Sequence, residues 1–444
     1  MTNLISSIYQ VNDFPHDRDE VLMARIKQHP SMKLVTVAQD FKLHERLKAW
    51  GIDDRQSLNM YDWLQGALDY KGQGRNYDFR VLPKYDKREM IMAPVTEGKE
   101  NYVDLKHDGQ RFARLDWLPG YVNRTQTRTM YTSNQNVWAK DLFDSRGFLS
   151  RRQYFNPDGK LGMELVFHVD GTPVLEISHM ADKTMYRLLG NHGLPNWLLA
   201  NELSLMLWWY GQIVKPNTVV YNDDPLLDPV WTQLDDRLKL IEVAHAQDLS
   251  NDRVAQLQSR EHVMAINPDV ARVYHYDYLN PWQPVGKVHG DKMYDKKKVA
   301  GVGRWLTNQM VDKLVGTIKL VHDENPDVKF DLLGYFTTDS QKYYQERMKN
   351  LKLLDIVNVR GKLVGEARKK FIQQAAVAFV IQTTVDSSVL PAMINHAGVP
   401  VVTNVSGFRG AYVTSDSAKL FAQGINMGLK QEKLWHKDVK AHAK

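Results

Sequence analysis

The chain has 444 residues, of which 43% are hydrophobic and 25% are charged, and it contains no cysteine. The lack of cysteine excludes disulfides, thiol nucleophiles and cysteine-ligated metal centres. The length predicts two or three globular domains. The net charge of +6 is small for this length and permits an anionic partner without requiring one, and since the sequence has no nucleic-acid-binding motif we expect no nucleic-acid partner.

The N-terminal region alternates between strand and helix patterns. Apolar stretches at 3–11 and 32–40 predict strands, and each is followed by an amphipathic segment of helical period, at 18–30 and 41–52. Gly51 ends the second helix. A strand–helix–strand–helix order indicates a parallel sheet.

From about residue 70 to residue 180 the pattern changes to short strands of alternating polarity. Asp-Gly pairs at 108–109, 158–159 and 170–171 separate several of these strands. Asp-Gly is typical of a hairpin turn, because the turn needs a positive φ. We therefore expect an antiparallel meander inserted into an α/β chain, with one face exposed to solvent and available to a partner.

The α/β pattern returns at about residue 184. The apolar segment 196–214 predicts a buried helix rather than a membrane span, because Asn201 and Glu202 lie inside it. Strands are expected at 217–224 and 237–249.

A second α/β unit follows a crossover at 271–286 that contains proline and glycine. Its predicted strands lie at 297–304, 328–336, 354–361, 375–384 and 399–404. Its predicted helices lie at 310–326 and 387–398. The Lys-rich segment 415–444 predicts a tail helix.

Two α/β lobes with a linker and a tail helix predict the GT-B architecture, in which a ligand binds between the lobes at the carboxyl ends of the strands. We expect lobe 1 at 1–69 and 181–280, with a β-domain inserted at 70–180. Lobe 2 is expected at 281–415 and a helical tail at 416–444. The first residues lack the pattern of a signal peptide, which together with the absence of cysteine indicates a cytoplasmic protein.

The segments 36–67 and 150–167 together resemble a bacterial group of GT-B glycosyltransferases whose first lobe carries an inserted β-domain. The group includes the poly(glycerol-phosphate) glucosyltransferases of teichoic acid decoration. It also includes the paired subunits of protein O-GlcNAc transferase, catalytic GtfA and its stabilising partner GtfB. The segment 303–404 is similar to the nucleotide-sugar lobe of retaining members, so the resemblance covers nearly the whole chain.

Active members of this family carry two glutamates eight residues apart. The first lies against the sugar, and the second holds the ribose hydroxyls. Aligned on Gly398, these positions are Val385 and Met393 in this chain, and neither side chain carries a charge. The resemblance therefore implies a donor site without its acids. Asp386 is either a displaced acid or, like Ser387, a cap of the following helix.

The family also neutralises the departing diphosphate with an arginine after the first strand of lobe 2 and a lysine five residues later. Here Arg304 is present, Gln309 occupies the lysine position, and Lys313 lies nearly one turn further along. Arg304, Ser387 and Ser388 are the residues expected to form a residual donor-phosphate site. The alternative is that Arg304 has only a structural role.

Several other polar residues are candidates for a site. His245 follows a predicted strand where the family often shows a histidine in the cleft, and it is interpreted as a relic. Asp223 and Asp224 end a strand, where adjacent carboxylates either bind a metal or cap the next turn, and no metal site is predicted. His179 and His192 lack acids at a useful spacing and are interpreted as structural.

The resemblance implies a catalytically degenerate, GtfB-like subunit that needs no cofactor of its own. Such a subunit stabilises a catalytic GtfA-like paralogue and binds the acceptor, a serine-rich surface protein, while the paralogue binds most of the UDP-GlcNAc. The inserted β-domain is expected to contact the paralogue. The lysines of the tail either face solvent or touch the inner face of the cell membrane.

Two alternatives stay open. One is an active retaining UDP-sugar glycosyltransferase that acts on teichoic acid or protein. It would need Asp386 or another acid, with Arg304 and Lys313 on the diphosphate. The other is a stand-alone carbohydrate-binding module.

Overall fold

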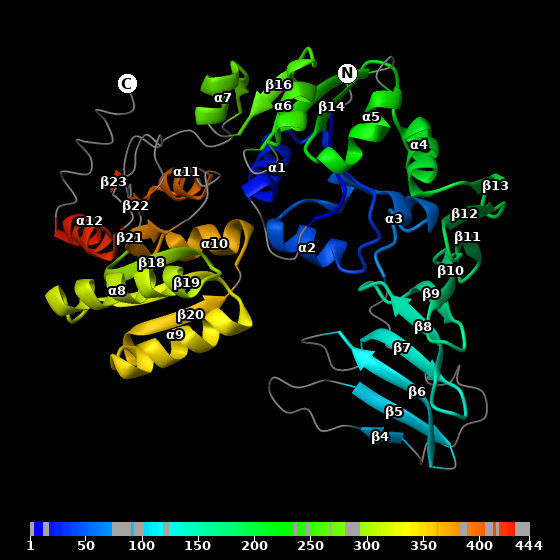
Figure 1. The fold of residues 1–444 in the computed structure, drawn as a ribbon, viewed down its shortest axis with the longest axis horizontal. Helices are drawn as coiled ribbons and strands as arrows, with labels where there is room; N and C mark the ends of the chain where they lie inside the picture. The colour runs from blue at the N-terminus through cyan, green and yellow to red at the C-terminus, as the bar shows by residue number, and fades with distance from the viewer. Residues whose placement is uncertain are drawn as a thin grey trace.

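The computed structural model shows three β-sheets with their helices (Figure 1). The described residues are 4–11, 17–72, 90–92, 102–107, 109–118, 124–234, 238–245, 249–266, 268–279, 294–361, 363–381, 389–404, 412–413 and 417–430. Two sheets are parallel and form lobe 1 and lobe 2, and the third is antiparallel and is inserted into lobe 1. This arrangement confirms the predicted α/β class.

Lobe 1 is a parallel sheet with the strand order β17-β16-β15-β14-β1-β2-β3. Its centre joins the two parts of the lobe, because Leu4 of β1 lies between Val219, from after the insertion, and Met32, from before it. The strands are β1 (Leu4–Ile8), β2 (Met32–Thr36), β3 (Ser57–Asn59), β14 (Thr218–Asn222), β15 (Leu238–Ala244), β16 (Val263–Ala265) and β17 (Asp277–Tyr278). The helices are α1 (Asp17–Gln28), α2 (Leu43–Trp50), α3 (Met60–Leu64), α4 (Glu202–Ile213), α5 (Asp228–Leu234), α6 (Asn251–Gln258) and α7 (Pro268–Tyr274).

The inserted sheet is an antiparallel meander in which successive strands are neighbours. Its strands are β4 (Met90–Met92), β5 (Tyr102–His107), β6 (Gln110–Trp117), β7 (Thr125–Tyr131), β8 (Val137–Phe143), β9 (Leu149–Phe155), β10 (Leu161–Phe167), β11 (Pro173–His179), β12 (Thr184–Leu189) and β13 (Asn196–Leu199). The glycines of the three Asp-Gly pairs all have positive φ, and a Cβ on any of them would meet no atom within 4 Å. Backbone conformation, and not lack of space, is therefore what favours glycine in these turns.

The prediction of one helix over 196–214 is wrong for its first residues. Asn196–Leu199 forms β13, the edge strand of the inserted sheet, and Asn201 caps α4 by accepting a hydrogen bond from the Ser204 amide at 2.9 Å. The continuous apolar run hides this boundary, because Trp197 and Leu198 look like core residues but are exposed. The sheet therefore continues beyond residue 180. No helix in the described part of the chain is long and apolar enough to cross a membrane.

Lobe 2 is a parallel sheet with the order β20-β19-β18-β21-β22-β23. Its strands are β18 (Asp295–Trp305), β19 (Lys329–Phe336), β20 (Val357–Gly361), β21 (Ala375–Val380), β22 (Val401–Thr403) and β23 (Tyr412–Val413). Its helices are α8 (Asn308–Glu324), α9 (Thr338–Asn350), α10 (Gly365–Ile372), α11 (Val389–His396) and α12 (Ala418–Lys430). The tail helix α12 packs on lobe 2, because Phe421 and Ile425 are buried in the same cluster as Val311 and Leu314 of α8.

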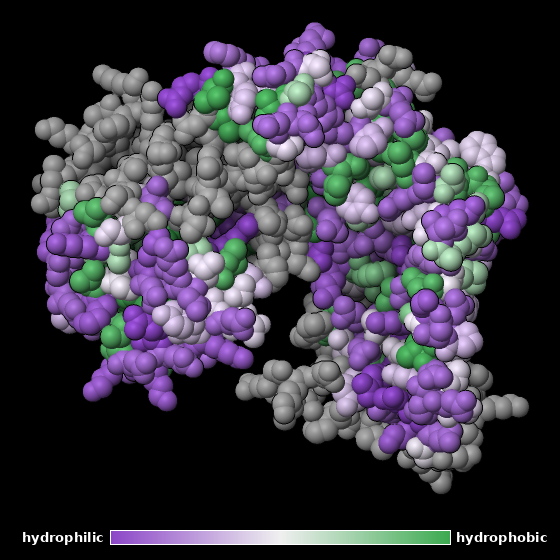
Figure 2. Space-filling view, viewed as in Figure 1, coloured by the Kyte–Doolittle hydropathy of each residue, from purple (hydrophilic) through white to green (hydrophobic). Residues whose placement is uncertain are grey.

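Buried polar groups fix the inserted sheet to lobe 1. The Arg146 guanidinium donates to Asp62 of α3 at 2.6 Å and to Asp144 at 2.7 Å. The side-chain amide of Gln65 donates to the backbone oxygens of Ser150 and Phe167 at 2.9 and 2.8 Å. Away from this junction, Figure 2 shows open space between lobe 2 and the inserted sheet on the viewed face.

Candidate functional site

The two lobes meet where α1 and α2 of lobe 1 lie against α10 and α11 of lobe 2. Glu20 of α1 and Arg368 of α10 form an ion pair, and both side chains are almost fully buried, at 4% and 7% exposure. Gly365, at the start of α10, has a φ of +56°, and a Cβ there would lie 2.9 Å from the carbonyl oxygens of Ala49 and Trp50. Glycine at this position therefore lets α10 approach the end of α2.

An apolar cluster continues this contact. Ala392 of α11 is buried together with Val21 of α1, Val243 of β15 and Ile266, and Met393 packs against the same cluster. Aligned on Gly398, position 393 is predicted to correspond to the ribose-binding acid of the glycosyltransferases that the sequence resembles. It lies in the second turn of α11, rather than at the start of the helix. Its side chain therefore belongs to the apolar contact between the lobes.

Arg304 lies at the carboxyl end of the central strand of lobe 2. It is the penultimate residue of β18, is half-buried and pairs in register with Tyr335 of β19. Gln309, in the first turn of α8, is exposed, and Lys313 is half-buried further along the same helix. Arg304 thus lies at the carboxyl end of the parallel strands, which is where ligands bind in open α/β sheets.

The carboxyl end of β21 lies at the same end of the sheet as the carboxyl end of β18, because the two strands pair in parallel. The predicted positions Val385, Asp386, Ser387 and Ser388 lie outside the described residues. The expected helix is present directly afterwards as α11, from Val389 to His396.

His245 directly follows β15 and is 1% exposed. Val243 of the same strand packs with Ala392 of α11, so the carboxyl end of β15 lies beside lobe 2. Asp223 accepts a hydrogen bond from the Ser6 hydroxyl at 2.7 Å and forms a buried ion pair with Arg25. Asp224 accepts from the Leu226 amide at 3.2 Å. These partners favour structural roles for both aspartates over metal binding.

The expectation that His179 and His192 lack acid partners is wrong. The His179 ring lies 2.8 Å from the Glu164 carboxylate on the neighbouring strand, and His192 Nε2 lies 3.3 Å from an oxygen of Asp170. Both contacts join residues far apart in the sequence, and spacing along one segment does not reveal them.

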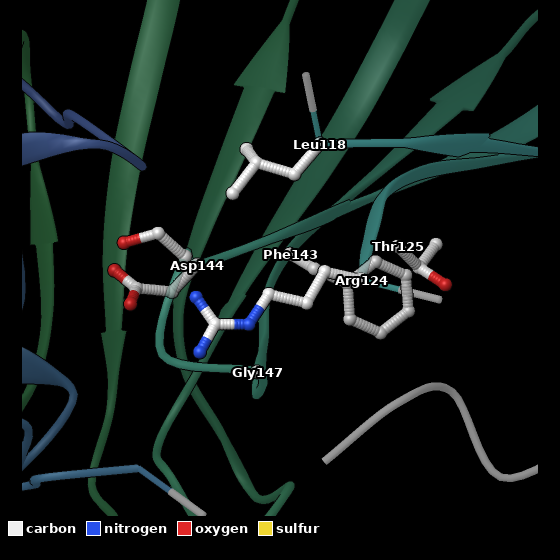
Figure 3. A pocket seen from close by; sticks show the side chains of 7 residues that line it. Leu118, Arg124, Thr125, Phe143, Asp144 and Gly147 are labelled. Atoms are coloured by element: carbon white, nitrogen blue, oxygen red, sulfur yellow. The ribbon is translucent and has the colours of Figure 1, made fainter. Parts of the chain in front are cut away.

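Two pockets in the described part of the chain are small. The pocket beside the lobe contact has a volume of about 190 Å³ and is lined by Glu20, Lys27, Arg368, Met393 and His396, among others. Ligand sites usually span about 300–1,000 Å³, so this pocket is too small for a whole nucleotide sugar. The pocket in Figure 3, where Arg124 extends toward Asp144, measures about 30 Å³ and has room only for water.

Two parallel α/β lobes in contact, with an antiparallel sheet inserted into the first, define the GT-B fold of glycosyltransferases with an inserted β-domain. The sequence matches no protein-family model and no curated protein sequence. Solved structures nevertheless match over the whole chain.

The pneumococcal O-GlcNAc transferase GtfA, solved in complex with UDP and GlcNAc, matches with a TM-score of 0.77 and 14% identity, over 100% of this chain and 94% of that chain. The Gap123 glycosylation-associated protein complex of Streptococcus agalactiae matches with a TM-score of 0.74 and 13% identity, over 99% and 96%. A mutant of S. aureus TarM, solved with fondaparinux, α-GlcNAc-glycerol and UDP, matches with a TM-score of 0.71 and 13% identity, over 100% and 97%. At these identities the likeness shows the fold.

Proposed function

We propose that this chain is a catalytically degenerate GT-B subunit. It stabilises a catalytic GtfA-like paralogue and binds the acceptor while the paralogue transfers GlcNAc from UDP-GlcNAc to a serine-rich surface protein. It works in the cytoplasm, with or without peripheral contact to the membrane. The observation that carries the proposal is the environment of Met393.

In a donor-binding glycosyltransferase of this family, an acid at that position holds the ribose hydroxyls. Met393 instead packs against an apolar cluster formed by Val21, Val243, Ile266 and Ala392. These side chains offer no hydrogen bond to a hydroxyl, and a ribose placed among them would lose its hydrogen bonds to water. The packing of Met393 between the lobes therefore supports a chain without a ribose-binding group at this position.

The diphosphate position supports the same proposal. Gln309 is exposed at the start of α8 and carries no charge, whereas the leaving group needs cations. The loss of one such electrostatic group costs about 2.7–4 kcal/mol of transition-state stabilisation in other enzymes. Loss of both the cation and the ribose acid would leave little catalysis.

The inserted sheet supports the choice of a protein partner. Its edge strand β13 carries Trp197 and Leu198, which are 54% and 64% exposed. An edge strand offers unpaired backbone groups, and two large apolar side chains beside them fit a protein surface better than water. Among the similar structures, Gap123 is a multi-protein complex.

A second candidate function is an active retaining UDP-sugar glycosyltransferase acting on teichoic acid or protein. The position of Arg304 at the carboxyl end of β18 favours it, because a cation there is suited to a diphosphate. Titration of the purified chain with UDP and UDP-GlcNAc in a calorimeter separates the two candidates. Degeneracy predicts no binding at millimolar ligand. Micromolar binding that Arg304→Ala abolishes would refute it and would require the chain to be assayed as an enzyme.

A further inference from the structure

Two histidines and an aspartate meet where the inserted sheet joins lobe 1. His168 and Asp170 lie in the turn between β10 and β11, and His192 lies in the loop between β12 and β13. His168 Nδ1 is 3.1 Å from Asp170 Oδ1, and His192 Nε2 is 3.3 Å from Asp170 Oδ2. The two imidazole rings stack with their centroids 3.7 Å apart.

These distances suit a shared metal ion. Ligand atoms about 2.0–2.1 Å from a tetrahedral zinc ion lie about 3.3 Å from one another. Both histidine–carboxylate distances, 3.1 and 3.3 Å, are already close to that value. One ligand atom from each of His168, Asp170 and His192 lies within 4.8 Å of the other two, so the remaining distance needs only a modest change.

The change needed is a rotation of one ring, because two parallel rings cannot both hold one ion in their planes. The His168 ring is confined, since a Cβ on Gly66 would lie 2.3 Å from its Nε2 atom. Its Nδ1 atom faces Asp170. The His192 side chain is more open, at 33% exposure against 19% for His168. His192 is therefore the side chain with more room to turn.

The Asp170 carboxylate is oriented by a hydrogen bond within its own turn. The Thr172 amide donates to Asp170 Oδ1 at 2.9 Å and so fixes the direction of the carboxylate. The turn is fixed to lobe 1, because the Val169 amide donates to the Gln65 carbonyl oxygen at 2.9 Å.

We propose that His168, Asp170 and His192 bind one zinc ion, with the fourth position open to water. Zinc prefers imidazole and carboxylate ligands in tetrahedral sites. The bound ion would link the β10–β11 turn to the β12–β13 loop at the point where Gln65 holds the turn to lobe 1. It would stabilise the orientation of the inserted sheet, and this role is independent of the proposed function.

The test is calorimetric titration of the untagged full chain with zinc chloride, followed by thermal unfolding with and without zinc. His192→Asn and Asp170→Asn remove ligands with little change of backbone. Asn tolerates the φ of 55° at position 192, and Asn-Gly forms the same turns as Asp-Gly. His29→Asn, at an exposed position outside the cluster, is the matched control.

We expect one tight equivalent of zinc in the wild type and in His29→Asn, and at least a tenfold weaker site in the other two variants. Zinc should raise the unfolding temperature of the wild type and of His29→Asn only. Circular dichroism checks that each variant is folded. The proposal is overturned if zinc binds His192→Asn or Asp170→Asn as tightly as it binds the wild type, or if the wild type has no tight site. The three side chains would then form only a hydrogen-bonded cluster.

Discussion

Removal of one partner from the buried ion pair between Glu20 and Arg368 should strongly destabilise the contact between the lobes. The substitution Arg368→Met removes the cation and leaves the Glu20 carboxylate buried, at 4% exposure, without its ion-pair partner. Breaking a buried pair by removing one partner costs about 3–5 kcal/mol, because the other charge stays buried without compensation. Burial already raises the pKa of Glu20 despite the opposing effect of Arg368, which shows that its charged form is costly here.

Replacement of both partners should cost much less. The double variant Glu20→Met with Arg368→Met leaves no buried charge, and such replacements are often close to neutral. The matched control is Arg347→Met, which breaks an ion pair with Asp312 in which both side chains are 44% exposed. Exposed pairs contribute at most about 1 kcal/mol.

The assay is urea unfolding of all four proteins, followed by tryptophan fluorescence and circular dichroism together, because a chain with several domains need not unfold in one step. We expect Arg368→Met to lower the free energy of unfolding in the earliest transition several times more than Arg347→Met does. The double variant should recover most of that loss. An Arg368→Met effect no larger than that of Arg347→Met, or a double variant at least as unstable as Arg368→Met alone, would contradict this expectation.

Three further predictions follow from the junction and the edge strand. The His44 ring nitrogens lie 2.8 Å from the Asp62 carboxylate and 2.9 Å from the Asp54 carboxylate. Burial and the charge of Arg146 lower the pKa of His44, but the contacts with the two carboxylates outweigh them, so the pKa is raised overall. Protonated His44 therefore stabilises the fold fully below about pH 6.5, and this stabilisation is lost as the pH rises through the raised pKa. The difference in unfolding free energy between wild type and His44→Gln should shrink from pH 6 to pH 9, and a constant difference would contradict this. Gln65→Leu removes a buried hydrogen-bond donor from backbone oxygens of the inserted sheet and should cost about 1–3 kcal/mol in urea unfolding, whereas an unchanged midpoint would show that the junction does not depend on it. Trp197→Ser combined with Leu198→Ser should weaken binding to the proposed GtfA-like paralogue in a pull-down titration and leave the unfolding temperature nearly unchanged, because both side chains are exposed; equal binding would show that β13 is not part of an interface.

The sequence predicts two lobes and an inserted β-domain, because the hydrophobic pattern of the insertion differs from that of the lobes. Buried strands and amphipathic helices alternate in both lobes, and Asp-Gly turns separate strands of alternating polarity in the insertion. The start of α4 is missed, because an exposed edge strand and a buried helix share one apolar run. Composition alone does not distinguish Trp197, which is exposed, from Trp209, which is fully buried.

The site is predicted only in part. The positions of Arg304 and His245 at strand ends follow from local pattern, since parallel strands end at a common edge. The Glu20–Arg368 pair joins residues 348 positions apart, and the cluster of His168, Asp170 and His192 forms only when hairpins pair. No short-range spacing encodes these contacts, so they appear only in three dimensions.

The segment 36–67 that carries the family resemblance includes junction residues. Asn59 caps α3, Asp62 binds Arg146, and Gln65 binds the strands of the inserted sheet. The resemblance therefore depends partly on residues that attach the insertion to lobe 1. Such residues serve an active and a degenerate chain equally well, so they do not distinguish the two.

Release of UDP from UDP-GlcNAc in the presence of a serine-rich acceptor tests whether this chain assists transfer without performing it. The release is measured for this chain alone, for the proposed GtfA-like paralogue alone and for both together. We expect no turnover by this chain alone, an increase when it is added to the paralogue, and the same increase with Arg304→Ala in this chain. Turnover by this chain alone that Arg304→Ala abolishes would show that the chain is itself an enzyme.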